Sequence, residues 1–119
     1  MNHIIVFKNS CFAQYPDVCR EIQEIYGPRS TIWNLTDILI QGVGGPIDTI
    51  PDPACSNGII IRISAKSYDE KQYLFQYYHE CVHVMYGTCL DPKRQKIIEE
   101  GIAAYFQLEI KPVRLVINP

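Results

Sequence analysis

Long hydrophobic runs are absent from this sequence of 119 residues. The longest apolar run near the N-terminus, Ile4 to Phe7, is much shorter than the core of a signal peptide. No internal stretch approaches the roughly 20 apolar residues that a membrane-spanning helix needs. We therefore expect a soluble, cytoplasmic protein that has no export signal and no membrane partner.

A surplus of basic residues is also lacking. Lys and Arg number 11 and Asp and Glu number 13, so the formal net charge is −2. The basic residues are scattered, and no stripe of positive charge is available to contact a phosphate backbone. We expect no nucleic acid partner.

Paired cysteines are the third absence. The five cysteines are an odd number, are irregularly spaced and include no C-x-x-C pair. Because free cysteine is among the most buried residue types, we expect reduced thiols that pack as small hydrophobic side chains.

The remaining composition is typical of a globular protein. Hydrophobic residues make up 47 % of the chain and charged residues 20 %, without a low-complexity tract. This length is enough for one hydrophobic core. We expect residues 1–119 to form a single domain, and nothing in the sequence indicates an oligomeric state.

Apolar patterns predict an α+β fold with a small mixed sheet. His3–Lys8 is apolar and β-branched, as in a buried strand, and Pro16–Tyr26 has helical spacing. Thr31–Ile40 and Ile59–Ser64 are two further expected strands. The Gly- and Pro-rich segment 41–58 between them is typical of a long loop.

A long helix is predicted to start at Tyr68 and to end before Gly87. Ser67 and Glu70 have the spacing of a capping box, and Gly87 stands where a left-handed C-cap belongs. One face of this helix is apolar and expected to be buried; it consists of Leu74, Tyr78, Cys81, Val82 and Met85.

A second helix is predicted from Asp91-Pro92 to about Leu108, with an N-cap followed by an N1 proline. Its apolar face consists of Ile97, Ile98, Gly101, Ile102, Tyr105 and Leu108. Glu100 falls on another flank, together with Ala103, Ala104 and Gln107. The small residues there would let the two helices approach closely. The tail 113–117 is expected to form a last strand or an extended arm.

The segment His79-Glu80-Cys81-Val82-His83 carries the chemistry. Histidines four residues apart in a helix stand on the same side, so both imidazoles can bind one metal ion. Glu80 lies further round the helix, where it can reach a water on that ion. These are the components of H-E-x-x-H hydrolysis, in which two histidines hold zinc and the glutamate takes a proton from the zinc-bound water. The alternative is a buried helix whose histidines are merely hydrogen-bonded.

A catalytic zinc site needs a third protein ligand and one open position. Glu100 is the expected third ligand because of its small neighbours. Glu99 is an alternative on the other side of the same helix. Cys55 is another, since peptide deformylases combine H-E-x-x-H with an upstream cysteine. Cys81 faces the core side and is expected to pack there.

The two helical segments resemble those of the gluzincin metallopeptidases, in which H-E-x-x-H is followed by a ligand glutamate in an E-G-x-A-x-Y-F type segment. The second segment here is Glu100-Gly101-Ile102-Ala103-Ala104-Tyr105-Phe106. The resemblance covers residues 59–108. It implies a zincin-like fold with an active-site helix and a glutamate helix. The zinc ligands and general base that it implies are His79, His83 and Glu100, with Glu80 as the base.

The resemblance also implies an activity, the hydrolysis of peptide bonds by a zinc-bound water that Glu80 activates. Ile59–Ser64 would then be the rim strand along which an extended peptide or protein substrate aligns. Because 19 residues follow Glu100, the C-terminal subdomain of larger gluzincins is expected to be largely absent. That subdomain supplies a side chain that stabilises the oxyanion, and Tyr86 and Tyr105 are candidates for its role.

A different class of function is compatible with the same residues. The short C-terminal part motivates a zinc-stabilised binding or regulatory module whose peptidase-like site turns over little or nothing. A related possibility is a latent peptidase in which residues 111–119 lie across the cleft. A purely structural zinc is less compatible, because neither helix offers a suitable fourth ligand.

Overall fold

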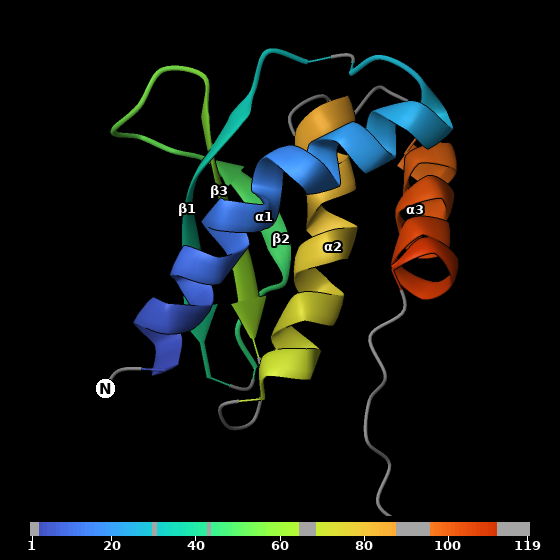
Figure 1. Cartoon of the computed structure of the whole chain (residues 1–119). Helices are drawn as coiled ribbons and strands as arrows, with labels where there is room; N and C mark the ends of the chain where they lie inside the picture. The colour runs from blue at the N-terminus through green and yellow to red at the C-terminus, as the bar shows by residue number, and fades with distance from the viewer. Residues whose placement is uncertain (1–2, 30, 43, 65–68, 88–95, 112–119) are drawn as a thin grey trace, which may run out of the picture.

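The computed structural model describes residues 3–29, 31–42, 44–64, 69–87 and 96–111, without the side chains of residues 96–98. These residues form a small sheet with helices packed beside it (Figure 1). In chain order the elements are α1 (His3–Tyr26), β1 (Asn34–Gln41), β2 (Asp48–Pro51), β3 (Gly58–Ser64), α2 (Glu70–Tyr86), α3 (Lys96–Tyr105) and a π-helical segment (Phe106–Ile110). The predicted α+β class is confirmed.

The predicted strand His3–Lys8 is instead the first part of helix α1. The buried residues of α1 recur at helical spacing along its length and are Phe7, Cys11, Val18, Cys19 and Ile22. Within the apolar run Phe7 faces inward, onto the ring of Tyr73 in α2, whereas Ile5 is 56 % exposed. The strand prediction was wrong because the buried residues of α1 follow helical spacing over a much longer segment. The packing of these residues against α2 overrides the local β propensity of residues 3–8.

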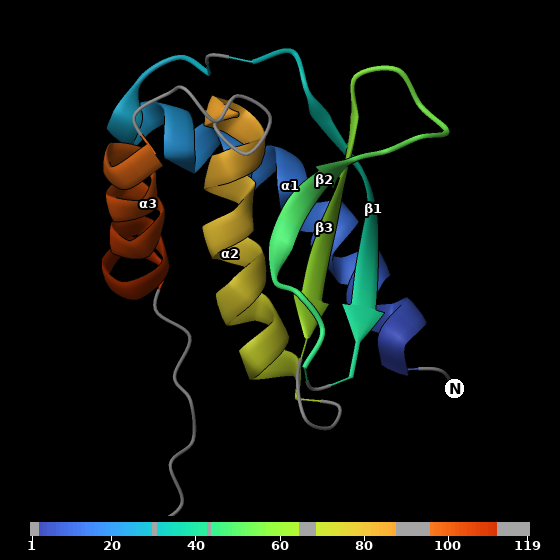
Figure 2. The same cartoon turned by 180° about the vertical axis from the view of Figure 1, so that it is seen from behind.

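Helix α1 bends near its middle. Pro16 lies inside it, where the proline ring removes one backbone hydrogen bond and crowds the preceding turn. The axis of α1 changes direction partway along its length (Figures 1 and 2). Its second half reaches α3, where the Tyr26 hydroxyl lies 3.5 Å from the Ile102 carbonyl oxygen. None of the helices among the described residues, including this one, is long and apolar enough to cross a bilayer.

Strand β3 is the central strand of the mixed sheet, whose order is β1-β3-β2. It pairs in parallel with β1 and antiparallel with β2. Its residues Ile59, Ile61 and Ile63 are fully buried. The strand predictions for 31–40 and 59–64 are therefore confirmed, although β1 begins only at Asn34.

Strand β2 corrects two predictions. The segment 41–58 was expected to be a loop, yet Asp48–Pro51 pairs with β3. Because β3 is paired on both sides, it cannot be the rim strand to which a peptide adds. Among the described residues the edge strands are β1 and β2, and the prolines Pro46 and Pro51 keep β2 short. A strand of this length carries too little periodicity to be recognised in the sequence.

The helices cover one face of the sheet. Figure 2 shows the strands from the opposite side, with α1 behind them. A buried hydrophobic cluster joins α1, β3 and α2, and it includes Ile22, Ile61, Tyr77, Val82 and Met85. The side-chain amide of Gln76 makes two hydrogen bonds, of 2.8 and 2.6 Å, to the backbone N–H and C=O of Ser64. These bonds anchor α2 against the end of β3.

Helix α2 begins at Glu70, later than predicted. Asp69 is the N-cap, and its carboxylate accepts hydrogen bonds from the backbone amides of Lys71 and Gln72. The predicted cap Ser67 and start Tyr68 lie outside the described residues. The left-handed C-cap Gly87 is confirmed, with φ 69°. The predicted buried face is confirmed except at Leu74, which is partly buried.

Helix α3 turns a different face inward from the one predicted. Tyr105 and Leu108 are 53 % and 54 % exposed, whereas Glu99, Ala103 and Phe106 are buried. The prediction was wrong because it assumed that the most apolar face of the helix is the buried one. Helix α2 places a histidine against α3, so the polar side chain of Glu99 is buried there in contact with His83. The predicted start Asp91-Pro92 and the tail 113–117 lie outside the described residues, and the π-helical segment ends at Ile110.

The four described cysteines are free thiols. Cys11, Cys19 and Cys81 are buried, in agreement with the sequence interpretation, and Cys55 is exposed. Cys89 lies outside the described residues. Burial raises the pKa of the Cys11 thiol to about 12, which keeps it protonated and unreactive.

Two glycines give a paired test of backbone conformation, one at the C-cap of α2 and one in the interior of α3. Gly87→Ala should lower the free energy of unfolding by about 1–2 kcal/mol or more, because it forces a left-handed residue and its Cβ meets the Thr31 methyl group. Gly101→Ala should raise the free energy of unfolding by about 0.5–1 kcal/mol, because Gly101 is helical and a Cβ there has open space. Urea unfolding measures both, and shifts of equal sign would contradict this assignment.

Candidate metal centre

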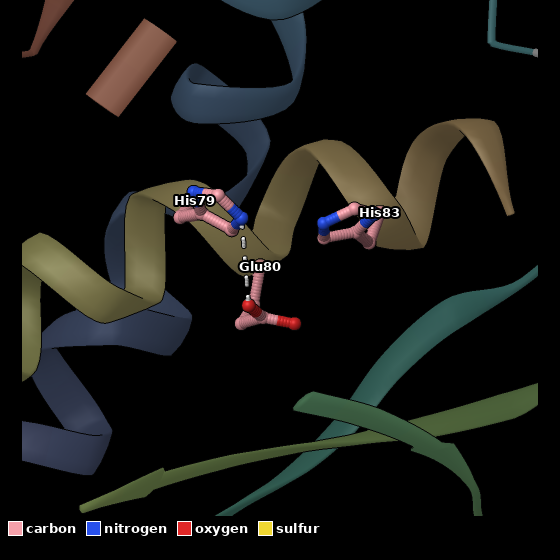
Figure 3. A group of neighbouring side chains, drawn as sticks. All are labelled: His79, Glu80 and His83. Carbon is pink, nitrogen blue, oxygen red and sulfur yellow. Dashed lines mark ion pairs between the residues drawn. The ribbon is translucent and has the colours of Figure 1, made fainter. Parts of the chain in front are cut away.

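Helix α2 presents His79, Glu80 and His83 from its second half (Figure 3). The two imidazole centroids are 5.1 Å apart. The Glu80 side chain points away from the helix toward the strands (Figure 3). These three residues bring their ligand atoms within 4.8 Å of one another, which is close enough to hold a metal ion.

His83 is oriented by Glu99 of α3. The Nδ1 atom of His83 lies 2.6 Å from Oε2 of Glu99, and both side chains are about 95 % buried. A carboxylate on Nδ1 holds the proton there, so that Nε2 is the nitrogen that a metal ion would bind. Glu99 therefore contacts the nitrogen that faces away from the proposed ion, and its position does not favour the alternative in which it is the third ligand.

His79 is oriented by Gln107 of the π-helical segment. The Gln107 side-chain N–H donates to the Phe75 carbonyl oxygen at 2.9 Å, so the amide oxygen faces His79 Nδ1 at 3.0 Å. That oxygen can only accept, which places a proton on Nδ1 and makes Nε2 the nitrogen that a metal ion would bind. Both histidines thus have the same arrangement, with Nδ1 occupied and Nε2 directed into the site.

Glu100 of α3 brings its carboxylate to both Nε2 atoms. One oxygen lies 3.4 Å from His79 Nε2 and the other 2.5 Å from His83 Nε2. The prediction that the flank with Ala103 would bring Glu100 to the histidine pair agrees with these distances, because Ala103 is fully buried. Whether the three side chains are metal ligands stays a prediction.

The donor set fits zinc. Two imidazole nitrogens and one carboxylate are ligands of catalytic zinc sites, and atoms about 2.0–2.1 Å from a tetrahedral ion are about 3.3 Å from each other. The contact of 3.4 Å between His79 and Glu100 has that length. The contact of 2.5 Å with His83 is shorter. The Glu100 side chain is 45 % exposed, so it has room to move away from His83 until the spacing suits a shared ion.

Glu80 lies farther from His79 than Glu100 does, although it belongs to the cluster that could hold a metal ion. Its Oε2 is 4.0 Å from His79 Nε2, and only 5 % of the residue is exposed. Burial is the largest cause that raises the pKa of Glu80, to about 7; the positive charge of His83 opposes it, and the carboxylates of Glu100, Asp48 and Glu99 add to it. A carboxyl group with a pKa near neutrality can both accept and release a proton.

The neighbouring carboxylates also act on His83. Burial alone would lower the pKa of its imidazole. The hydrogen bond to Glu99 and the charges of Glu80 and Glu100 outweigh burial, so the pKa of His83 is raised. The site thus attracts positive charge.

A cavity of about 560 Å³ opens beside these residues. Its wall includes His79, Glu80, His83 and Glu100 on one side and residues 47–49 around the start of β2 on the other. Phe75 and Gln72 of α2 extend the wall away from the histidines. The cavity is large enough for a few residues of a peptide or for a small ligand.

Other residues considered in the sequence lie elsewhere. The Tyr86 hydroxyl donates to the Gly27 carbonyl oxygen at 2.8 Å, Tyr105 is exposed, and neither tyrosine lines the cavity. Cys55 is exposed and does not line it either. Cys81 is buried in the core, as predicted. Residues 112–119, which include most of the tail proposed to cover the cleft, lie outside the described residues.

The sequence analysis placed Gln107 on the flank of Glu100 and considered Glu99 as a ligand, but it missed that these two residues orient the imidazoles. Gln107 follows Glu100 by seven residues, about two helical turns, which puts both on the same flank. Glu99 precedes Glu100 directly, and only the approach of α3 to α2 shows that adjacent carboxylates reach opposite nitrogens of one imidazole.

Comparisons of the chain with protein-family models, with curated proteins and with solved structures found no match. The similarity to gluzincins and the zincin-like fold therefore remain inferences from the residues of this chain.

Proposed function

We propose that the protein is a zinc-dependent metallopeptidase of the gluzincin type, with His79, His83 and Glu100 as zinc ligands and Glu80 as the general base. One observation carries this proposal. The Glu100 carboxylate approaches both Nε2 atoms from a second helix, at 3.4 and 2.5 Å, while both Nδ1 atoms are held by other side chains.

The charges at the site also support a divalent cation. Glu80, Glu99 and Glu100 surround two imidazoles, and the wall of the cavity contains neither Lys nor Arg among the described residues. Carboxylates gathered in a partly buried site repel each other. A cation held between Nε2 and carboxylate oxygens offsets this repulsion.

A bound zinc ion would supply Lewis acidity, which lowers the pKa of a water molecule and polarises a peptide carbonyl. The protein supplies the proton transfer. Glu80 lies outside the ligand set but lines the same cavity, so its carboxylate can take a proton from the attacking water and pass it to the leaving amine. Burial of Glu80 keeps bulk water away from this transfer.

Strand β2 supports an extended peptide as the substrate. It is an edge strand that lines the cavity through Asp48 and Thr49, so its backbone can add a peptide as a further strand beside the histidines. Pro46 and Pro51 bound this edge and limit the pairing to a few residues.

The alternative is a zinc-binding regulatory or interaction module with little turnover. The positions of Tyr86 and Tyr105 favour it, because neither of these oxyanion candidates lines the cavity. A protein that binds zinc stoichiometrically and cleaves no peptide in a broad library would have this function.

Zinc content tests the metal centre itself. The purified parent should hold one zinc ion per chain by elemental analysis. His83→Ala and Glu100→Ala should each weaken zinc binding by more than about 100-fold, since even a partner that only orients a ligand contributes about 10- to 100-fold. His3→Ala, at the exposed start of α1, is the control and should bind like the parent. A parent without zinc, or variants with unchanged affinity, would contradict the assignment.

Glu80→Gln tests the proposed base. The variant should keep its zinc while hydrolysis of fluorogenic peptides falls about 100- to 10,000-fold, because the amide cannot accept the proton. Cleavage by the variant at the rate of the parent would show that Glu80 is not the base. Zinc binding without cleavage by either protein would favour the regulatory module.

Gln107→Leu tests the orientation of His79. Loss of the oxygen that accepts from Nδ1 should lower the zinc affinity by about 10- to 100-fold, as measured by competition with a chromophoric chelator. Gln107→Glu keeps an acceptor oxygen and should bind more tightly than the leucine variant. The same change at an exposed glutamine, Gln23→Leu, is the matched control. Equal affinities in all variants would mean that the contact does not orient the imidazole.

A further inference from the structure

The side-chain hydroxyl of Thr49 is an unsatisfied hydrogen-bonding group in the wall of the cavity. Thr49 lies in the middle of β2, opposite Ile61 of β3, and is 5 % exposed. Its hydroxyl oxygen is buried and has no hydrogen-bond partner among the described residues. A buried hydroxyl without a partner is costly and uncommon, so its presence in a cavity wall calls for a role.

Glu80 is the matching acceptor. It lines the same cavity as Thr49, is equally buried, and points from α2 toward the strands (Figure 3). Its contact with His79 Nε2, at 4.0 Å, is longer than a hydrogen bond. A buried carboxylate thus stands in one wall of the cavity and a buried, uncommitted hydroxyl in another.

Other side-chain donors in the wall are already engaged. The amide N–H of Gln76 donates to the Ser64 carbonyl oxygen and that of Gln107 to the Phe75 carbonyl oxygen. The Thr49 hydroxyl is also shielded from solvent, so we expect its partner to be a neighbouring protein group.

We propose that Thr49 is a positioning residue whose hydroxyl, which makes no hydrogen bond to Glu80 in this structure, donates one to a carboxylate oxygen of Glu80 in the zinc-loaded protein. The other carboxylate oxygen is then turned toward the attacking water. This inference rests on the proposed peptidase function, in which Glu80 is the base. Strand β2 would then have two roles, because it would bind the substrate along its edge and orient the base Glu80 through Thr49.

Two variants of Thr49 separate the hydroxyl from packing. Thr49→Val has nearly the same shape without the hydroxyl, and kcat should fall about 10- to 100-fold with KM within about twofold of the parent, because the lost bond serves the chemical step. Thr49→Ser restores the hydroxyl and should recover most of kcat. Zinc content should be unchanged in both.

Thr36→Val is the matched control. Thr36 lies on β1 and its hydroxyl donates to Asp52 at 2.6 Å, and it does not line the cavity. Loss of this bond should lower stability and leave kcat unchanged. A valine variant of Thr49 with the parent's kcat, a serine variant as impaired as the valine variant, or an effect on KM alone would overturn the proposal.

A crystal structure of the zinc-loaded parent gives a result that does not depend on activity. The oxygen of the Thr49 hydroxyl should lie about 2.5–3.0 Å from a Glu80 oxygen, which is the range for hydrogen bonds between oxygens. A longer separation from both oxygens would overturn the inference even if the protein is an active peptidase. If this distance is found but no peptide is cleaved, the peptidase function fails while the contact stands.

Discussion

The contact between helices α2 and α3 is the interaction on which the candidate site depends. Side chains from the α3 side hold both imidazoles of α2 by their Nδ1 atoms, Glu99 at His83 and Gln107 at His79. Glu100 is placed between these two anchors and meets both Nε2 atoms. Because each imidazole is fixed at its Nδ1 atom, the two Nε2 atoms and the Glu100 carboxylate come together.

The rest of the fold keeps this contact in register. The N-cap Asp69 and the C-cap Gly87 define the length of α2, and the paired hydrogen bonds of Gln76 fix it against Ser64 at the end of β3. Buried Ala103 allows close approach of α3. The change to π-helix at Phe106 directly precedes Gln107, and π-helical turns are frequent at functional sites.

The sequence predicted what depends on local periodicity. Four-residue spacing in a helix is sufficient to place His79 and His83 on one side and Glu80 beside them. The run of isoleucines that opens Ile59–Ser64 is sufficient to mark β3. The sequence failed where tertiary contacts decide. The start of α1 has the composition of a strand, β2 is too short to show a period, and α3 buries Glu99 in preference to Leu108 because its neighbour is a histidine.

The edge position of β2 and the orientation of Glu80 connect the fold to the proposed chemistry. An antiparallel strand that pairs only on one side among the described residues runs beside the cavity, and the Glu80 carboxylate points toward it (Figure 3). The carboxylates around the histidines make the same cavity a favourable place for a cation. Strand pairing with a peptide, cation binding and proton transfer can then all take place in this one cavity.

The anomalous diffraction signal of zinc in crystals of the loaded protein shows whether His79, His83 and Glu100 bind one ion. We predict a single peak about 2.0–2.2 Å from His79 Nε2, His83 Nε2 and one Glu100 oxygen, with Glu80 outside bonding distance. A peak bound by Glu99 or Cys55 in place of Glu100, or no peak between the two helices, would contradict the account.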